Sequence, residues 1–125
     1  MKKILIVDDQ QEVRELVSVT LEIGSHEILT ASNGSEALKV ARSAHPDVIL
    51  LDVMMPGSPD GIEVCRRLKS DESTQDIYIV ILTAKGQDAD RQRGADAGAD
   101  DYFVKPFSPL ELMQKIDTVL TDQGN

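Results

Sequence analysis

The stretch Val48-Ile49-Leu50-Leu51-Asp52 decides the fold class, because it is an uninterrupted apolar run that ends in a carboxylate. Three further runs have the same design: Ile4–Val7 ends at Asp8-Asp9, Tyr78–Leu82 ends at Thr83, and Tyr102–Val104 ends at Lys105. Short runs that are apolar throughout are typical of strands buried on both faces, as in a parallel sheet covered by helices. We therefore interpret each run as a buried strand with a polar residue at its carboxyl end.

The segments between these runs have helical periodicity, except for one more strand expected at Glu27 to Ala31. The predicted helices cover Val13 to Gly24 (with Val13, Leu16, Val17 and Leu21 as its apolar stripe), Asn33 to Ala44, Gly61 to Ser70, Asp88 to Ala97, and a last segment from Ser108. Asn33, Asp60 and Ser108 each stand three residues before a glutamate, which is the spacing of a capping box. Gly94 is expected to interrupt the fourth helix.

Five strands that alternate with five helices predict an α/β fold. Because crossovers between parallel strands are right-handed almost without exception, few topologies remain. We predict a three-layer α/β/α sandwich whose five-stranded parallel sheet has the order 2-1-3-4-5, the flavodoxin-like arrangement. A chain of 125 residues is long enough for one domain with its own core. We assign residues 1–122 to this domain and residues 123–125 to a tail or the start of a linker.

Composition restricts the classes of partner. The formal net charge of −9 repels phosphodiester backbones, so we expect no direct nucleic-acid binding by this domain. No stretch approaches the length of a membrane span, and Asp8-Asp9 interrupts the short apolar run at the N-terminus, so we expect neither a membrane anchor nor a secretory signal. The single cysteine, Cys65, excludes an internal disulfide and is interpreted as a buried small hydrophobe. A cytoplasmic location fits these features.

The polar residues that end the strands predict the chemistry. In parallel sheets the carboxyl ends of the strands form the crevice in which ligands bind. The predicted strand order places Asp8, Asp9 and Asp52 beside one another, and like charges this close favour a bound cation. Carboxylate oxygens favour Mg²⁺, which keeps waters free for a phosphate group. Lys105 supplies a positive charge and Thr83 a hydroxyl at the same edge.

These residues resemble a known family along essentially the whole chain, from Lys3 to Leu120. The acidic pair, Asp52-Val53-Met54-Met55-Pro56-Gly57, Leu82-Thr83-Ala84 and Lys105-Pro106-Phe107 are similar to the motifs of the receiver (CheY-like) domain of two-component response regulators. The resemblance implies a phosphoacceptor signalling domain, not an enzyme for external substrates, that takes a phosphoryl group on Asp52 from a sensor histidine kinase or a phosphotransfer protein. It further implies that Asp8, Asp9, Asp52 and the backbone carbonyl of Met54 hold Mg²⁺. Lys105 would pair with the phosphoryl oxygens, and the Lys105-Pro106 bond would be cis.

The resemblance also implies a switch and an output surface. Thr83 would move toward the phosphoryl group, and Tyr102 would rotate inward to fill the space behind its strand. The signalling surface would then lie on the fourth helix, fifth strand and fifth helix. There, Arg91, Asp101, Glu111 and Lys115 match charges that pair across a symmetric dimer in the winged-helix transcription-factor branch of the family. A phosphorylation-dependent homodimer through this face is one reading, and a solvated charged face is the other.

Other functions have weaker support in the sequence. An aspartate-nucleophile phosphatase would normally need a second acid two residues after the nucleophile, where this chain has Met54. A flavin-binding module would need hydroxyls and amides in the acidic first loop. Because neither Met54 nor Lys85 is suited to orienting an attacking water, we expect slow self-dephosphorylation. His26 and His45 are interpreted as surface residues, and Met54 and Met55 as loop packing.

Overall fold

The computed structural model describes residues 2–24, 26–55, 59–84, 88–105 and 108–123. The strands are β1 (Lys3–Val7), β2 (Glu27–Ala31), β3 (Val48–Asp52), β4 (Tyr78–Ala84) and β5 (Asp101–Lys105). The helices are α1 (Gln11–Glu22), α2 (Gly34–Ala44), α3 (Gly61–Ser70), α4 (Asp88–Asp96) and α5 (Pro109–Gln123). Strands and helices alternate along these ranges, as the sequence predicts.

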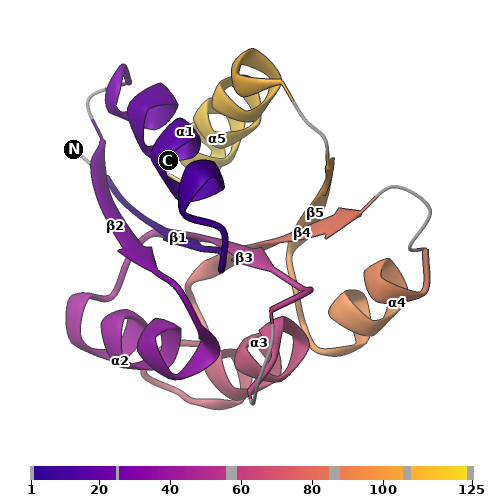
Figure 1. Cartoon of the computed structure of the whole chain (residues 1–125). Coiled ribbons are helices and arrows are strands. Elements are labelled where there is room, and N and C mark those ends of the chain that lie inside the picture. The colour runs from indigo at the N-terminus through magenta and orange to yellow at the C-terminus, as the bar shows by residue number, and fades with distance from the viewer. Residues whose placement is uncertain (1, 25, 56–58, 85–87, 106–107, 124–125) are drawn as a thin grey trace.

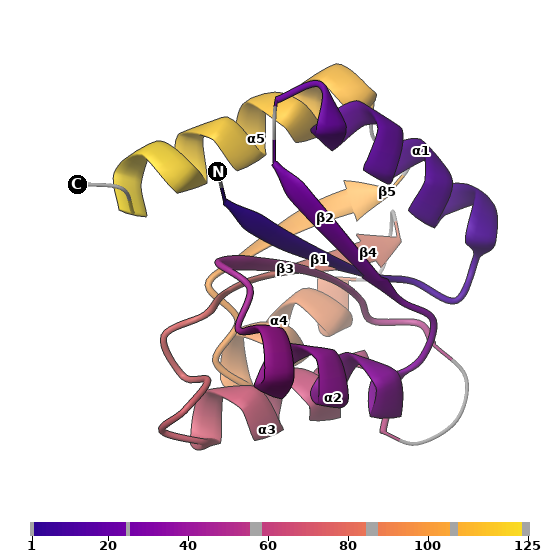
Figure 2. The ribbon, with the colours of Figure 1, turned by 90° about the vertical axis from the view of Figure 1, so that its left-hand side faces the viewer.

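The five strands form one parallel sheet with the order β2-β1-β3-β4-β5. Figure 1 shows the sheet nearly edge-on, with α1 and α5 on one face and α2, α3 and α4 on the other. The turned view in Figure 2 shows the same three layers. The predicted α/β/α sandwich and its strand order are therefore confirmed.

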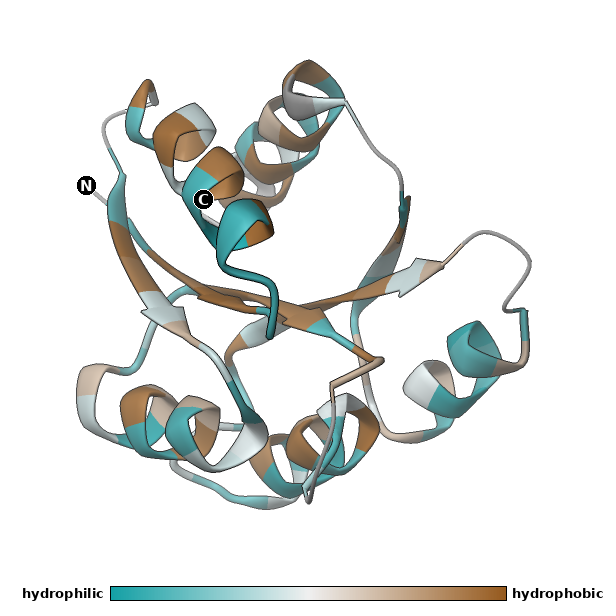
Figure 3. Cartoon of the chain, viewed as in Figure 1, coloured by the Kyte–Doolittle hydropathy of each residue, from teal (hydrophilic) through white to brown (hydrophobic). Residues whose placement is uncertain are grey.

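The apolar strand runs form two cores, one on each face of the sheet. Alternate residues of β3 point to opposite faces: Ile49 and Leu51 pack toward α2 and α3, whereas Val48 and Leu50 pack toward α1 and α5. All five β3 residues are buried. Figure 3 shows the apolar colouring concentrated on the strands and on the sides of the helices that face them. Burial on both faces explains why β3 carries no polar residue before Asp52 at its end.

Side-chain caps fix the helix starts that the sequence predicts. The Asn33 side chain accepts the backbone N–H of Glu36 at 2.9 Å, and the Asp60 side chain accepts that of Glu63 at 2.9 Å. The Ser108 hydroxyl accepts the backbone N–H of Glu111 at 3.0 Å. These three predicted N-caps are confirmed, and those of α3 and α5 stand at the carboxyl edge of the sheet.

Two expectations about the helices are wrong. Leu16 is exposed and not part of the buried stripe of α1, because the surface that α1 buries is carried by Val17, Thr20 and Leu21. Gly94 does not interrupt α4, which continues to Asp96. Instead, the missing side chain lets α4 approach β4: a Cβ added at Gly94 would lie 2.2 Å from Cδ1 of Ile81.

Within the described ranges, no helix combines the length and the apolarity that a bilayer crossing requires. Two sequence-based expectations fall outside those ranges: the geometry of the Lys105-Pro106 bond and the role of the Lys85 side chain.

Candidate phosphoacceptor and metal site

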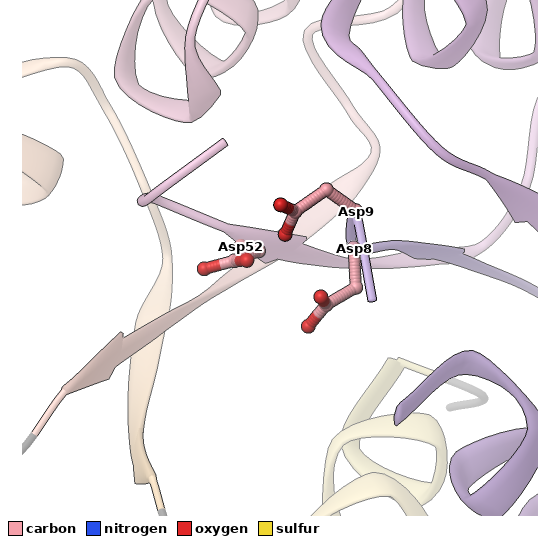
Figure 4. A group of neighbouring side chains, drawn as sticks. All are labelled: Asp8, Asp9 and Asp52. Carbon is pink, nitrogen blue, oxygen red and sulfur yellow. The ribbon is translucent and has the colours of Figure 1, made fainter. Parts of the chain in front are cut away.

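Three carboxylates gather at the carboxyl edge of the sheet. β1 pairs with β3 in parallel, so the residues that follow or end these strands lie side by side. Figure 4 shows Asp8, Asp9 and Asp52 at this edge, and one oxygen of each lies within 4.8 Å of the others. Asp8 and Asp52 are buried, whereas Asp9 is exposed. The structure thus brings together the three acids that the sequence singles out.

Lys105 reaches this cluster from β5, which lies two strands away from β3 in the sheet. Its Nζ lies 2.7 Å from Oδ2 of Asp8 and 3.6 Å from Oδ2 of Asp52. The ammonium group therefore compensates part of the negative charge. It stands where it could also pair with the oxygens of a group bound to Asp52.

The surroundings of Asp52 favour its protonated form. Burial is the main cause that raises the pKa of this carboxyl, and the neighbouring Asp8 raises it further. The charge of Lys105 and the backbone N–H of Met54, which donates to Oδ1 at 3.1 Å, act in the opposite direction. A divalent cation among these acids would reverse the balance, because it attracts the ionised form.

The donor set fits Mg²⁺. All three side chains offer hard oxygen atoms, which this ion prefers, and exposed Asp9 leaves the cluster open to solvent on one side. The hydrogen bond from the Met54 backbone to Asp52 keeps that peptide segment beside the acids. The side chain of Met54 is exposed, so its interpretation as loop packing is wrong, whereas Met55 is buried as expected.

Thr83 lies on β4, beside the end of β3, where Asp52 and Leu82 are paired. The side chain is buried, and within the described part of the chain its hydroxyl oxygen has no hydrogen-bond partner. Buried hydroxyls are usually paired, so an unpaired one next to Asp52 calls for an explanation. An incoming group that carries acceptor oxygens would give this hydroxyl a partner.

Tyr102, on β5, points outward and is 39% exposed. The guanidinium carbon of Arg91 lies 3.9 Å from the ring centroid, and Nη2 of Arg91 donates to the phenolic oxygen. Arg91 also lies 3.6 Å from a carboxylate oxygen of Asp88 on the same helix. An arginine of α4 thus holds the tyrosine in the outward position.

The four charged residues expected on a dimer face are distributed over α4, β5 and α5. Within one chain, Nζ of Lys115 already lies 2.7 Å from Oδ2 of Asp101. Arg91 contacts Tyr102, and the backbone of Glu111 completes the cap of α5. Three of the four charges are therefore paired within the chain, Lys115 with Asp101 and Arg91 with Asp88, and a partner chain would have to compete with these ion pairs.

Sequence reasoning missed one feature beside the site and one feature at the opposite edge of the sheet. Nη1 of Arg14, on α1, donates to the backbone carbonyl of Asp8 at 2.7 Å. Its only sequence signal is a lone arginine six residues after a strand-ending aspartate. His26 was expected on the surface, but both of its ring nitrogens are buried, and Nε2 lies 3.7 Å from a carboxylate oxygen of Asp117. This expectation is wrong because the ring packs near α5, whereas His45 is exposed as expected.

Comparison with known proteins places this arrangement in a family. The family model described as the response regulator receiver domain matches residues 4–117. Among solved structures, the chemotaxis response regulator CheY4 of Vibrio cholerae is similar, with a TM-score of 0.89 and 37% identity over 96% of this chain and 99% of that one. The BeF3-activated DrrB receiver domain has a TM-score of 0.84 and 33% identity over 97% of this chain and 98% of that one.

Curated relatives agree with this match. The phosphate regulon transcriptional regulatory protein PhoB of Pseudomonas aeruginosa is 50% identical over 98% of this chain and 53% of the relative. The transcriptional regulatory protein ResD of Bacillus subtilis is 48% identical over 94% of this chain and 48% of the relative. The chain thus spans about half the length of these relatives. With its sheet order, its edge of carboxylates and these matches together, the chain belongs to the response regulator receiver domain family of two-component signalling.

Proposed function

We propose that this domain is a switch that accepts a phosphoryl group on Asp52 from a sensor histidine kinase or a phosphotransfer protein, with Mg²⁺ as cofactor. One observation carries the proposal: three carboxylates lie within 4.8 Å of one another, with the ammonium group of Lys105 against two of them. This arrangement suits a transferred phosphoryl group, because catalysis of that transfer depends mainly on positioning and charge.

Each residue has a role in the transfer. Bound Mg²⁺ supplies neutralising charge to the phosphoryl oxygens, and Asp8, Asp9, Asp52 and the Met54 carbonyl are the groups that would hold it. A carboxylate oxygen of Asp52 forms a bond to phosphorus while the phosphorus–nitrogen bond of the donor histidine breaks. The electron pair goes to the histidine nitrogen. Lys105 pairs with the oxygens of the transferred phosphoryl group, and its ion pair with Asp8 weakens as it does so.

The switch would use Thr83 and Tyr102. A phosphoryl group adds charge and three strong acceptor oxygens, so the unpaired hydroxyl of Thr83 gains a partner by moving toward it. Tyr102 then turns inward, and the surface formed by α4, β5 and α5 changes. Such a two-state element biased by a local charge needs no new fold.

Partner binding would follow at that surface. Arg91, Asp101, Glu111 and Lys115 lie there, and a phosphorylation-dependent homodimer is one partner that these charges fit. The net charge of −9 argues against direct nucleic-acid binding by this domain. We also propose a cytoplasmic location. The receiver domain would cover residues 1–122, with residues 123–125 as a tail or the start of a linker.

Phosphoryl release should be slow. The side chain two residues after Asp52 is the exposed thioether of Met54, which orients water poorly and is no second acid for a phosphatase. Decay of phosphoprotein in Met54→Asn that is no faster than in the wild type would contradict this expectation.

Incubation with acetyl phosphate and Mg²⁺ followed by intact-mass measurement tests the proposal. We expect one phosphoryl group per chain, lost in Asp52→Asn and retained in the control Asp47→Asn, whose aspartate lies at the opposite edge of the sheet beside Lys3. Undiminished labelling of Asp52→Asn would overturn the assignment. Continuous release of phosphate without accumulation of phosphoprotein would instead indicate a phosphatase.

A further inference from the structure

The loop between β1 and α1 carries two of the three acids. It runs from the end of β1 through Asp8, Asp9 and Gln10 to the start of α1. Gln10 holds the N-cap position of α1, yet its side chain makes no capping hydrogen bond. The backbone N–H of Gln10 instead donates to Oδ1 of Asp8 at 2.9 Å, so the loop depends on how Asp8 is held.

Asp8 is held on every side. Its backbone N–H donates to the carbonyl of Ala31 at 3.2 Å, and its Oδ2 accepts from Lys105 at 2.7 Å. Its carbonyl oxygen lies beyond the last residue of β1, and there it accepts from Nη1 of Arg14 at 2.7 Å. Hydrogen bonds with an ionised donor are roughly twice as strong as neutral ones. The guanidinium therefore fixes the peptide that joins Asp8 to Asp9.

The charge of Arg14 is not committed elsewhere. Among the ion pairs of the ranges that the structure describes, none includes Arg14, whereas Arg66, Arg67, Arg91 and Arg93 each pair with a carboxylate. The neighbouring Glu15 accepts a hydrogen bond from Gln11. Arg14 thus adds a positive charge beside the acidic loop. It contacts the backbone carbonyl of Asp8, whereas Lys105 contacts the Asp8 carboxylate.

We propose that Arg14 is a positioning residue of the Mg²⁺ site, which holds the Asp8–Asp9 peptide so that both carboxylates face Asp52 before the ion arrives. The inference rests on the proposed function. Preorganisation matters most for Asp9, because this exposed side chain stands on a loop and has no packing to orient it. Groups that hydrogen-bond to metal ligands without touching the metal orient those ligands, and their mutation typically lowers metal affinity by about 10- to 100-fold.

Two measurements on Arg14→Gln, Arg14→Lys and the control Arg42→Gln test this role. The control removes an exposed arginine from the last turn of α2. Calorimetric titration with Mg²⁺ alone should give affinity that is lower by about tenfold in Arg14→Gln, less reduced in Arg14→Lys, and unchanged in the control. In metal-free protein, hydrogen exchange of the Gln10 amide should be fastest in Arg14→Gln, intermediate in Arg14→Lys, and equal to the wild type in Arg42→Gln.

The outcomes separate this inference from the proposed function. Wild-type affinity and wild-type Gln10 exchange in folded Arg14→Gln would overturn the positioning role. A lower melting temperature with unchanged Mg²⁺ affinity would also overturn it, since that result describes a merely structural contact. If Arg14→Gln does not fold, the comparison of Arg14→Lys with wild type decides. Absence of saturable Mg²⁺ binding by the wild type would overturn the proposed function instead.

Discussion

β3 and β5 are parallel strands of one sheet and have five residues each, yet their surroundings differ along their whole length. Every residue of β3 is buried, whereas β5 alternates between half-buried and exposed positions. β3 is covered by helices on both faces, and β5 lies at the sheet edge beside the polar helix α4. The strand that carries Asp52 is thus buried throughout, whereas the strand that carries Tyr102 is half-buried or exposed at every position.

This contrast suits a receiver domain in which the proposed phosphoryl transfer takes place on β3 and the proposed conformational change on β5. Asp52 must meet its partners within a fraction of an ångström, and a close-packed core provides that precision. In the proposed switch Tyr102 changes its position, and a half-covered edge strand allows this at little cost. Local stability in proteins varies in this way, and segments that move are drawn from its low end.

The contrast predicts unequal responses to the same truncation. Leu50→Ala, in fully buried β3, should lower the free energy of unfolding by about 3 kcal/mol through lost burial and a residual cavity. Val104→Ala, in β5, should lower it by less than about 1 kcal/mol, because that side chain is 36% exposed. Urea unfolding of both variants measures the two values. Equal losses of unfolding free energy in the two variants would contradict the difference in packing between β3 and β5.

Two glycines offer a matched test of helix contacts on the sheet, Gly61 of α3 against β3 and Gly94 of α4 against β4. A Cβ added at Gly61 would lie 2.1 Å from the carbonyl oxygen of Asp52, and one added at Gly94 would lie 2.2 Å from the terminal methyl of Ile81. Backbone cannot yield as a flexible side chain can, so Gly61→Ala should destabilise the fold by about 2 kcal/mol. Gly94→Ala should be nearly neutral, because about 1 kcal/mol of helix propensity offsets the strain.

Thermal unfolding and acetyl phosphate labelling of both glycine variants check this prediction. Gly61→Ala should also label more slowly, because the shift it requires falls on Asp52, the proposed phosphoacceptor. A Gly94→Ala variant less stable than Gly61→Ala would place the rigid contact at α4 instead.

The pKa of Asp52 predicts how stability depends on pH. Since burial and Asp8 raise this pKa from its ordinary value of 3.8, the folded protein without metal holds the proton more tightly than the unfolded chain does. The contribution of Asp52 is therefore favourable at low pH and is lost as the pH rises through the raised pKa. Asp52→Asn should therefore raise the melting temperature at pH 7 and have no effect near pH 3.

Thermal scans between these pH values, with the exposed Glu72→Gln as control, measure the effect. Saturating Mg²⁺ should cancel the advantage of Asp52→Asn at pH 7, because the ion stabilises only the ionised carboxylate. A variant that is less stable than wild type at pH 7 without metal would contradict the raised pKa.

The smallest expected effect concerns the contact of Arg91 with Tyr102. An exposed cation–π contact contributes about 0.5–1 kcal/mol, so Arg91→Ala should lower the free energy of unfolding by less than about 1 kcal/mol. The variant should nevertheless populate the inward position of Tyr102 more often, since the outward position has lost its partner. NMR of the Tyr102 ring, with and without beryllofluoride, reports the population. Arg91→Lys, which keeps the charge but loses the planar contact, is the matched variant.

The sequence predicts the parts of this molecule that depend on backbone pattern. The apolar runs and the capping residues predict the strands and the helix starts and leave few topologies, and the order chosen among them, which the structure confirms, places Asp8, Asp9 and Asp52 at one edge. Contacts made by long side chains could not be predicted. The reach of Arg14 to the Asp8 carbonyl, the ring of Tyr102 beside Arg91 and the internal pair of Lys115 with Asp101 depend on rotamers that no periodicity encodes.

The buried thiol of Cys65 has a practical consequence for observing the switch. It lies in the core between α3 and the sheet, and burial raises its pKa to about 11. At neutral pH the nucleophilic thiolate is therefore scarce, and alkylating dyes cannot reach it. A second cysteine placed on exposed β5 or α4 would react selectively in an otherwise unaltered chain. Spin or fluorescent probes could then follow the surface formed by α4, β5 and α5, where the proposed switch acts, without removal of Cys65.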